Sequence, residues 1–171
     1  VSGGHTGISV VNEGSGLARA TATGTVSGGT NGIIAVNTSG TGTTYVGAGG
    51  QVTGSSGYGV NVSDNGFSNA MTVSTVGVTG GTYGISAVHN GISGGLSITS
   101  TGAVSGASNR GILASNLASS AAGVDISANA VSGFREGIYA THGGTGSLMV
   151  TANGQVTSTS DGVAYDGIHA R

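Results

Sequence analysis

A repeat of about 26 residues runs through the whole chain and limits its fold more than any other feature. Each copy begins with Val followed by Ser or Thr, and successive valines stand 25, 26, 26, 26, 27 and 25 residues apart. These valines are Val1, Val26, Val52, Val78, Val104, Val131 and Val156. Because self-similarity at a fixed period of this size is typical of solenoid proteins, the spacing predicts a stack of similar coils.

Each repeat carries two further apolar signals. A Gly-(Ile/Val) pair follows a short loop, and then come two small or apolar residues that are two positions apart. The anchors of the first signal are Ile8, Ile33, Val60, Ile85, Ile112 and Ile138, and in the last repeat Gly167-Ile168 fits better than Gly162-Val163. The second signal is formed by Ala18 and Ala20, Thr44 and Val46, Met71 and Val73, Leu96 and Ile98, Val124 and Ile126, and Leu148 and Val150. A spacing of two places both side chains on one face of a strand, so we expect three short strands per repeat, separated by Gly-rich corners.

Strands of two or three inward residues are too short for a conventional sandwich, but they can form a coil. The sequence therefore predicts an all-β fold, a single-stranded parallel β-helix that occupies residues 1–171 as one continuous segment of about six and a half coils. Stacking at about 4.8 Å gives a length of roughly 30 Å. The coil length favours a right-handed helix. Val1 stands in repeat phase and Arg171 in mid-repeat, so we expect the segment to belong to a longer repeat region.

One column of each repeat contains only Asn, Asp and His, four residues after the anchor. Its members are Asn12, Asn37, Asp64, His89, Asn116 and His142. These are the non-glycine residue types most often found at positive φ, and their side chains can also bond nearby backbone, so the column predicts a ladder of turn residues. His89 and His142 belong to it and lie two coils apart, and we interpret them as corner residues rather than metal ligands.

The composition excludes several classes of function. The chain of 171 residues has 37 Gly, no Pro, no Cys and no Lys, and four Arg stand against six Asp plus Glu. A net charge of −2 and so few cations do not suit phosphate neutralisation, which argues against nucleic acid as a partner. No apolar run reaches the roughly 18 residues that a membrane-spanning helix needs, so no membrane contact is expected of this segment. The sequence contains no motif for a cofactor.

Two patterns offer alternative functions. The loop from Ser160 to Asp166 contains Asp161, Tyr165 and Asp166, and its two carboxylates are the one pair that could serve a polysaccharide-active enzyme or bind Ca²⁺. We interpret this stretch first as a solvated loop. A complete column of Ser and Thr follows the repeat valines, and a second hydroxyl column contains Thr21, Gly47, Ser74, Thr99, Ser127 and Thr151. Regular hydroxyl arrays on a flat face would also suit ice binding. Ser and Thr are nevertheless common on exposed strand positions for ordinary reasons.

A variable outward column is the candidate interaction surface. It follows each anchor by one residue and contains Ser9, Ile34, Asn61, Ser86, Leu113, Tyr139 and His169. Apolar and aromatic side chains on a solvent-facing column can mark an interaction site, although single exposed apolar residues are common. We predict that contacts with a partner are made here.

The phrases TATGTVSGGTNGIIAVN, TGAVSGASNRGILASN and TANGQVTSTSDGVAYDGIHAR resemble repeats in the passenger regions of Gram-negative autotransporters and large surface adhesins. The resemblance covers essentially the whole chain. It implies a parallel β-helix displayed outside the bacterial cell, held at the outer membrane by regions that are not in this chain. It also implies a role in adhesion, aggregation, or biofilm or fibre formation, without catalysis. The partners it implies are carbohydrate or protein on host or environmental surfaces, or like chains that associate end to end or laterally.

Overall fold

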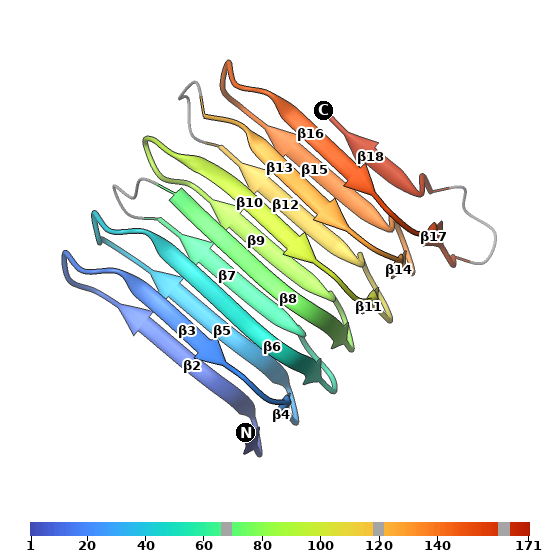
Figure 1. Cartoon of the computed structure of the whole chain (residues 1–171), viewed down its shortest axis with the longest axis horizontal. Helices are drawn as coiled ribbons and strands as arrows, with labels where there is room; N and C mark the ends of the chain where they lie inside the picture. Colours follow the sequence, from blue (N-terminus) through green and yellow to red (C-terminus); the bar gives the residue numbers. More distant parts are fainter. Residues whose placement is uncertain (66–69, 118–121, 161–164) are drawn as a thin grey trace.

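A computed structural model describes residues 1–65, 70–117, 122–160 and 165–171 of the chain. The fold is an all-β parallel solenoid of about six turns, with about 26 residues per turn. Figure 1 shows the coils stacked side by side from the N-terminal to the C-terminal end, with all strands of one sheet running in the same direction. The described part of the chain contains no helix, and hence none that could cross a membrane.

One sheet is formed by the strands that carry the Gly-(Ile/Val) anchors, and we call it the anchor sheet. Its members are β2 (Thr6–Asn12), β5 (Asn31–Asn37), β7 (Val60–Asp64), β9 (Ile85–His89), β12 (Ile112–Asn116), β15 (Ile138–His142) and β18 (Ile168–Ala170). The strands pair in the predicted register, with each anchor opposite the next one. Ile138 lies opposite Ile168, which confirms the Gly167-Ile168 alignment of the last repeat.

The other two strands of each coil share a second, bent sheet, which we call the hydroxyl sheet. The Val-(Ser/Thr) strands are β1 (Ser2–Gly3), β4 (Val26–Gly28), β11 (Val104–Gly106), β14 (Val131–Gly133) and β17 (Val156–Ser158). The strands of the third signal are β3 (Ala18–Ala22), β10 (Gly95–Ser100), β13 (Val124–Ala128) and β16 (Leu148–Ala152). In two coils both parts form one long strand, β6 (Thr44–Gly54) and β8 (Ala70–Gly80). The expected separation of these two strands is found between β3 and β4, β10 and β11, β13 and β14, and β16 and β17, whereas β6 and β8 continue through the bend.

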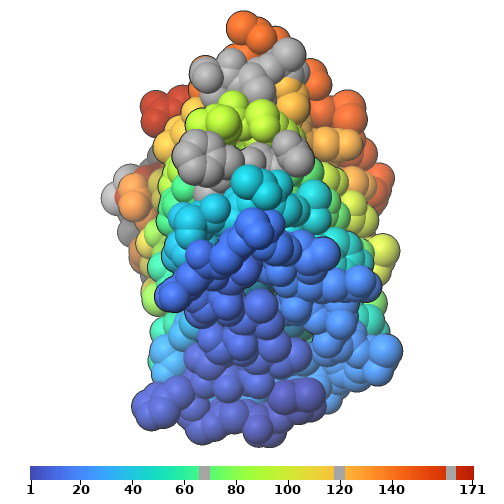
Figure 2. Space-filling view, turned by 90° about the vertical axis from the view of Figure 1, so that its left-hand side faces the viewer, coloured from blue at the N-terminus to red at the C-terminus, as the bar shows by residue number. Residues whose placement is uncertain are grey.

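The core consists of columns of identical or similar apolar side chains that face inward from the three strand positions. The anchors from the second to the sixth coil have no solvent exposure, and neither have Val46, Val73, Ile98 and Ile126. Because burial of a Val, Ile or Leu side chain is worth roughly 1.5–3 kcal/mol and each coil contributes several, the stack is stabilised mainly by contacts between neighbouring coils. The layered arrangement of the coils is visible from outside in Figure 2.

The glycine before each anchor is required by the packing of the next coil. A Cβ atom built on Gly84 would lie 2.6 Å from Val104 Cγ1 and 2.6 Å from the carbonyl oxygen of Gly111. The equivalent glycine from the first to the sixth coil meets the same two atoms, at 2.3–2.8 Å. None of these glycines has a positive φ. Glycine is therefore needed here for space rather than for an unusual backbone conformation.

Candidate functional site

The predicted interaction column lies on the outer side of the anchor sheet. Its residues follow one another in register across all the coils, as the sequence predicts: Ser9, Ile34, Asn61, Ser86, Leu113, Tyr139 and His169. All but one of these residues are at least partly exposed. Ser86 is the exception, with 5% of its surface exposed. Ser86 thus has the predicted outward position, but the expected solvent exposure is wrong, because its small side chain stands between the larger Asn61 and Leu113.

A second column runs beside it, along the corner that precedes the anchor sheet. Its residues stand immediately before the glycine of each coil: Thr6, Asn31, Tyr58, Tyr83, Arg110, Glu136 and Asp166. Backbone hydrogen bonds keep the middle part of the column in register. The carbonyl oxygens of Tyr58 and Tyr83 each accept a bond of 3.0 Å from a glycine N–H in the coil before, and that of Arg110 accepts one of 3.2 Å.

Aromatic and arginine side chains stack on one another at this corner. The rings of Tyr58 and Tyr83 are nearly parallel, with centroids 5.3 Å apart. The guanidinium carbon of Arg110 lies 4.1 Å from the ring centroid of Tyr139, which in turn stacks on His169 at 5.1 Å. These contacts bring the variable outward column and the corner column together. We call the resulting surface the aromatic edge, formed by Tyr58, Tyr83, Arg110, Arg135, Glu136, Tyr139, Tyr165, Asp166 and His169.

Ion pairs fix several polar groups of the aromatic edge. Arg110 Nε donates a hydrogen bond of 2.8 Å to Glu136 Oε2, and both side chains are largely buried. Asp166 Oδ2 lies 3.1 Å from His169 Nδ1 in a more exposed setting. The guanidinium of Arg135 lies 5.0 Å from the ring centroid of Tyr165. Of the three predicted loop residues, Tyr165 contacts Arg135 of the preceding coil and Asp166 contacts His169 of its own coil, whereas Asp161 lies outside the described residues.

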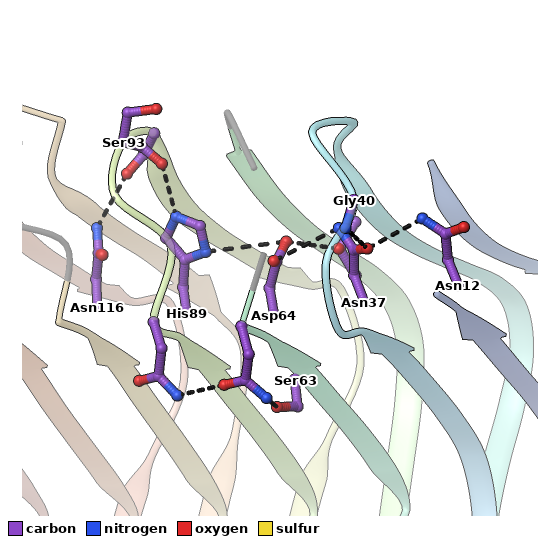
Figure 3. A network of polar contacts seen from close by, with 12 residues as sticks. Asn12, Asn37, Gly40, Ser63, Asp64, His89, Ser93 and Asn116 are labelled. Atoms are coloured by element: carbon purple, nitrogen blue, oxygen red, sulfur yellow. Dashed lines mark hydrogen bonds and ion pairs between the residues drawn. The ribbon is translucent and has the colours of Figure 1, made fainter. Parts of the chain in front are cut away.

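The column of Asn, Asp and His forms a polar ladder inside the coil. Asn12 Nδ2 donates to Asn37 Oδ1 at 3.0 Å (Figure 3). Asp64 Oδ2 accepts a bond of 2.7 Å from the hydroxyl of Thr44. Asn37, Asp64, His89 and Asn116 are fully buried. No non-glycine residue of the described segments has a positive φ, so the expectation of left-handed residues in this column is wrong. The expected side-chain bonds to nearby backbone are present, for example from the Gly40 N–H to Asn37 Oδ1 at 3.0 Å. These side chains pair with one another and with corner backbone, which satisfies most of the polar groups that burial would otherwise leave unpaired. The Nδ1 atoms of His89 and His142 are buried without a hydrogen-bond partner in the described segments.

The two histidines of this ladder are in opposite tautomers when neutral. His89 Nε2 lies 2.9 Å from the carbonyl oxygen of Ser93, which can only accept, so this nitrogen carries the proton. His142 Nε2 instead accepts a bond of 3.1 Å from the N–H of Gly146, so its proton is on Nδ1. The same column position thus closes one corner as a donor and another as an acceptor. This assigns both histidines a structural role.

The two hydroxyl columns also lie in the predicted register, on the outer face of the hydroxyl sheet. The second column is not a flat array, because the tip of the Tyr45 side chain leans over Gly47. A Cβ atom on Gly47 would lie 2.7 Å from the Tyr45 hydroxyl oxygen. The guanidinium of Arg19, one coil earlier, lies 5.4 Å from the Tyr45 ring centroid. A bulky pair therefore interrupts the hydroxyl face.

The described carboxylates are distributed over different parts of the coil. Asp64 belongs to the buried ladder, Glu136 and Asp166 to the aromatic edge, and Asp125 to the outer face of the hydroxyl sheet, opposite Met149. Within the described segments, no group of three or more His, Cys, Asp or Glu side chains could hold a metal ion. The pair proposed from the sequence, Asp161 with Asp166, cannot be placed because Asp161 lies outside these segments.

No protein-family description, characterised protein or solved structure matches this chain significantly.

Sequence reasoning missed the corner half of the aromatic edge. Tyr58, Tyr83 and Arg110 stand in the short loop before the Gly-(Ile/Val) pair, for which the apolar pattern predicts no strand and no site. A signal was present, since these residues stand at a constant position directly before the glycine of each coil. A constant position in a solenoid places side chains in a column, whether or not the residue type is constant.

Proposed function

We propose that this segment is a structural and adhesive rod of an extracellular bacterial surface protein, similar to an autotransporter passenger, and that it acts through binding rather than catalysis. One observation supports this proposal above the others. Inward positions repeat the same apolar types from coil to coil, while the outward column of the anchor sheet changes from Ile34 to Asn61, Leu113, Tyr139 and His169. Variation limited to the surface of a regular scaffold is what a recognition surface requires.

The charge and shape of the described surface fit this role. The chain has few ionic groups and many small polar ones, so long-range attraction to nucleic acid or anionic membranes is not expected. The rod offers extended lateral faces, which suit partners on a host or environmental surface, carbohydrate or protein, or other copies of the chain. Its place would be outside the cell, held there by regions beyond this segment.

Two alternatives receive less support. Ice binding needs a flat and regular hydroxyl array, and Tyr45 with Arg19 interrupts that face. A polysaccharide-active enzyme of the usual kind needs two carboxyl groups that flank the scissile bond. The described carboxylates instead make contacts within the solenoid or lie on separate faces.

Display of residues 1–171 on a non-adherent bacterium tests the proposal. We expect displaying cells to settle faster or to adhere to epithelial cells or abiotic surfaces more than cells that display an unrelated domain. The Ile34→Ser, Leu113→Ser variant should lose part of this gain. Met149→Ser, an exposed change on the hydroxyl sheet, should retain it. Equal behaviour of displaying and control cells in every assay would refute the adhesive role.

A further inference from the structure

Most aromatic and arginine side chains of this chain lie at one corner of the solenoid. Five of its seven Tyr and Phe residues lie at the aromatic edge or directly beside it, namely Tyr58, Tyr83, Phe134, Tyr139 and Tyr165. Three of the four arginines, Arg110, Arg135 and Arg171, lie there as well. The scaffold does not require such residues, because the same corner is formed with Thr6 and Asn31 in the first two coils.

The aromatic edge is long, narrow and only partly covered. Tyr58 and His169 are separated by four coil steps, or about 19 Å at the usual strand spacing. Parallel rings whose centroids are 5.3 Å apart are in the range of offset stacking, so a strip of each tyrosine face stays open. Tyr58, Tyr83 and Arg110 are all partly exposed, and the loop residues next to them are small: Ser55, Ser56, Gly81 and Ser108.

We propose that the aromatic edge binds a carbohydrate chain, with the sugar rings running along the solenoid axis. This inference rests on the proposed adhesive function and names the class of ligand for its surface. Tyrosine rings would contact the C–H faces of the sugars. Guanidinium and carboxylate groups would bind hydroxyl pairs, since both are planar groups that form paired hydrogen bonds.

The geometry favours a carbohydrate over a protein partner. A stable protein interface covers about 800 Å² on each side and has a well-packed core from which charged residues are depleted. The aromatic edge is a narrow row that contains ionic groups and is bordered by serine and glycine. A polysaccharide is likewise linear and narrow, and it has apolar faces with a polar rim.

Donor groups at the edge remain available to such a ligand. Arg135 is partly exposed, and no carboxylate of the described segments pairs with its guanidinium. Its Nε atom is buried and has no hydrogen-bond partner in these segments, so a ligand would meet the terminal amino groups of the guanidinium. Arg110, in contrast, is held by Glu136 and by the ring of Tyr139. We therefore assign Arg110 to positioning the aromatic rings and Arg135 to direct contact with sugar hydroxyl or carboxylate groups.

Affinity electrophoresis of the purified chain tests this assignment. Native gels would contain either neutral polysaccharides, such as xylan, laminarin and dextran, or uronic-acid polymers, such as alginate and polygalacturonate. We expect at least one polymer to retard the chain. The Tyr58→Ala, Tyr83→Ala variant and, separately, Arg135→Gln should reduce this retardation at least tenfold in apparent affinity. Tyr45→Ala removes a tyrosine from the hydroxyl sheet and should leave it unchanged.

The controls keep the outcomes distinct. Circular dichroism would show whether each variant is folded. If the Tyr58→Ala, Tyr83→Ala variant unfolds, the single variant Tyr83→Ser takes its place. The proposal is overturned when no polymer retards the chain, when the edge variants bind as the unmodified chain does, or when Tyr45→Ala causes an equal loss. Capture of a protein in place of any polysaccharide overturns it too. Cell adhesion without polysaccharide binding would refute the carbohydrate proposal but not the adhesive function. Absence of adhesion in the display assay would refute the adhesive function.

Discussion

Replacing Gly84 by alanine tests the packing that couples one coil to the next. The added Cβ atom would lie 2.6 Å from Val104 Cγ1, 2.6 Å from the Gly111 carbonyl oxygen and 2.9 Å from that of Ser105. Contacts below 3.0 Å cannot persist, so the neighbouring coil has to shift. Overpacking of a tight core costs about 1–3 kcal/mol.

Thermal unfolding followed by circular dichroism measures this cost. Because a chain of this length loses about 2–4 °C in Tm per kcal/mol, Gly84→Ala should lower the Tm by about 2–12 °C. Gly16 provides the matched control, since nothing lies within 4 Å of a Cβ atom built there. Gly16→Ala should change the stability by no more than about 0.5 kcal/mol.

A double variant separates side-chain from backbone crowding. Val104→Ala removes the close Cγ1 atom, but the two carbonyl oxygens stay where they are, so we expect it not to rescue Gly84→Ala. Full rescue would show that the valine alone limits the space. If Gly84→Ala is as stable as Gly16→Ala, the argument that these glycines are required for space is refuted.

Two further changes test the core and the buried ladder by denaturant unfolding. Ile98→Ala should lower the free energy of unfolding by about 2–5 kcal/mol, because it leaves a cavity in a fully buried column. Thr99→Ala, on the exposed side of the same strand, should change it by no more than about 0.5 kcal/mol. Equal effects would contradict the assignment of inward and outward residues on this strand. Asp64→Ala removes the acceptor of the buried Thr44 hydroxyl and should cost about 1–3 kcal/mol, so an unchanged midpoint would show that the ladder contributes little.

The sequence was sufficient to predict the coil and its register. Valine, anchor and third-strand positions recur at nearly constant spacing, and the pairing of Val26 with Val52 and of Ile33 with Val60 follows from that spacing alone. Local composition was less reliable at the corners. The bend at Gly49 and Gly50 was expected to separate two strands, yet β6 continues through it.

The polar ladder shows why residue type misled the prediction of the turn column. Asn, Asp and His favour positive φ in loops, but Asn37 is four residues after Ile33 on the same strand and therefore faces inward by alternation. The two-residue period of the strand predicts the direction of this side chain better than its residue type does. Every inward side chain has to pack on the equivalent side chain of the next coil. Burial of Ser86 could not be predicted in this way, since it depends on the sizes of the side chains in adjacent coils.

The contact between the glycine of one coil and the valine of the next has a consequence for how such a chain can change in length. Each coil has a glycine that faces the next coil and a valine that packs on the glycine of the coil before. A coil can therefore be duplicated, removed or exchanged without changes in its neighbours. Unequal spacings of 25 to 27 residues are taken up at the corners, where side chains are free to vary. A rod of this kind can therefore be lengthened in whole units while its exposed edge acquires new residues one coil at a time.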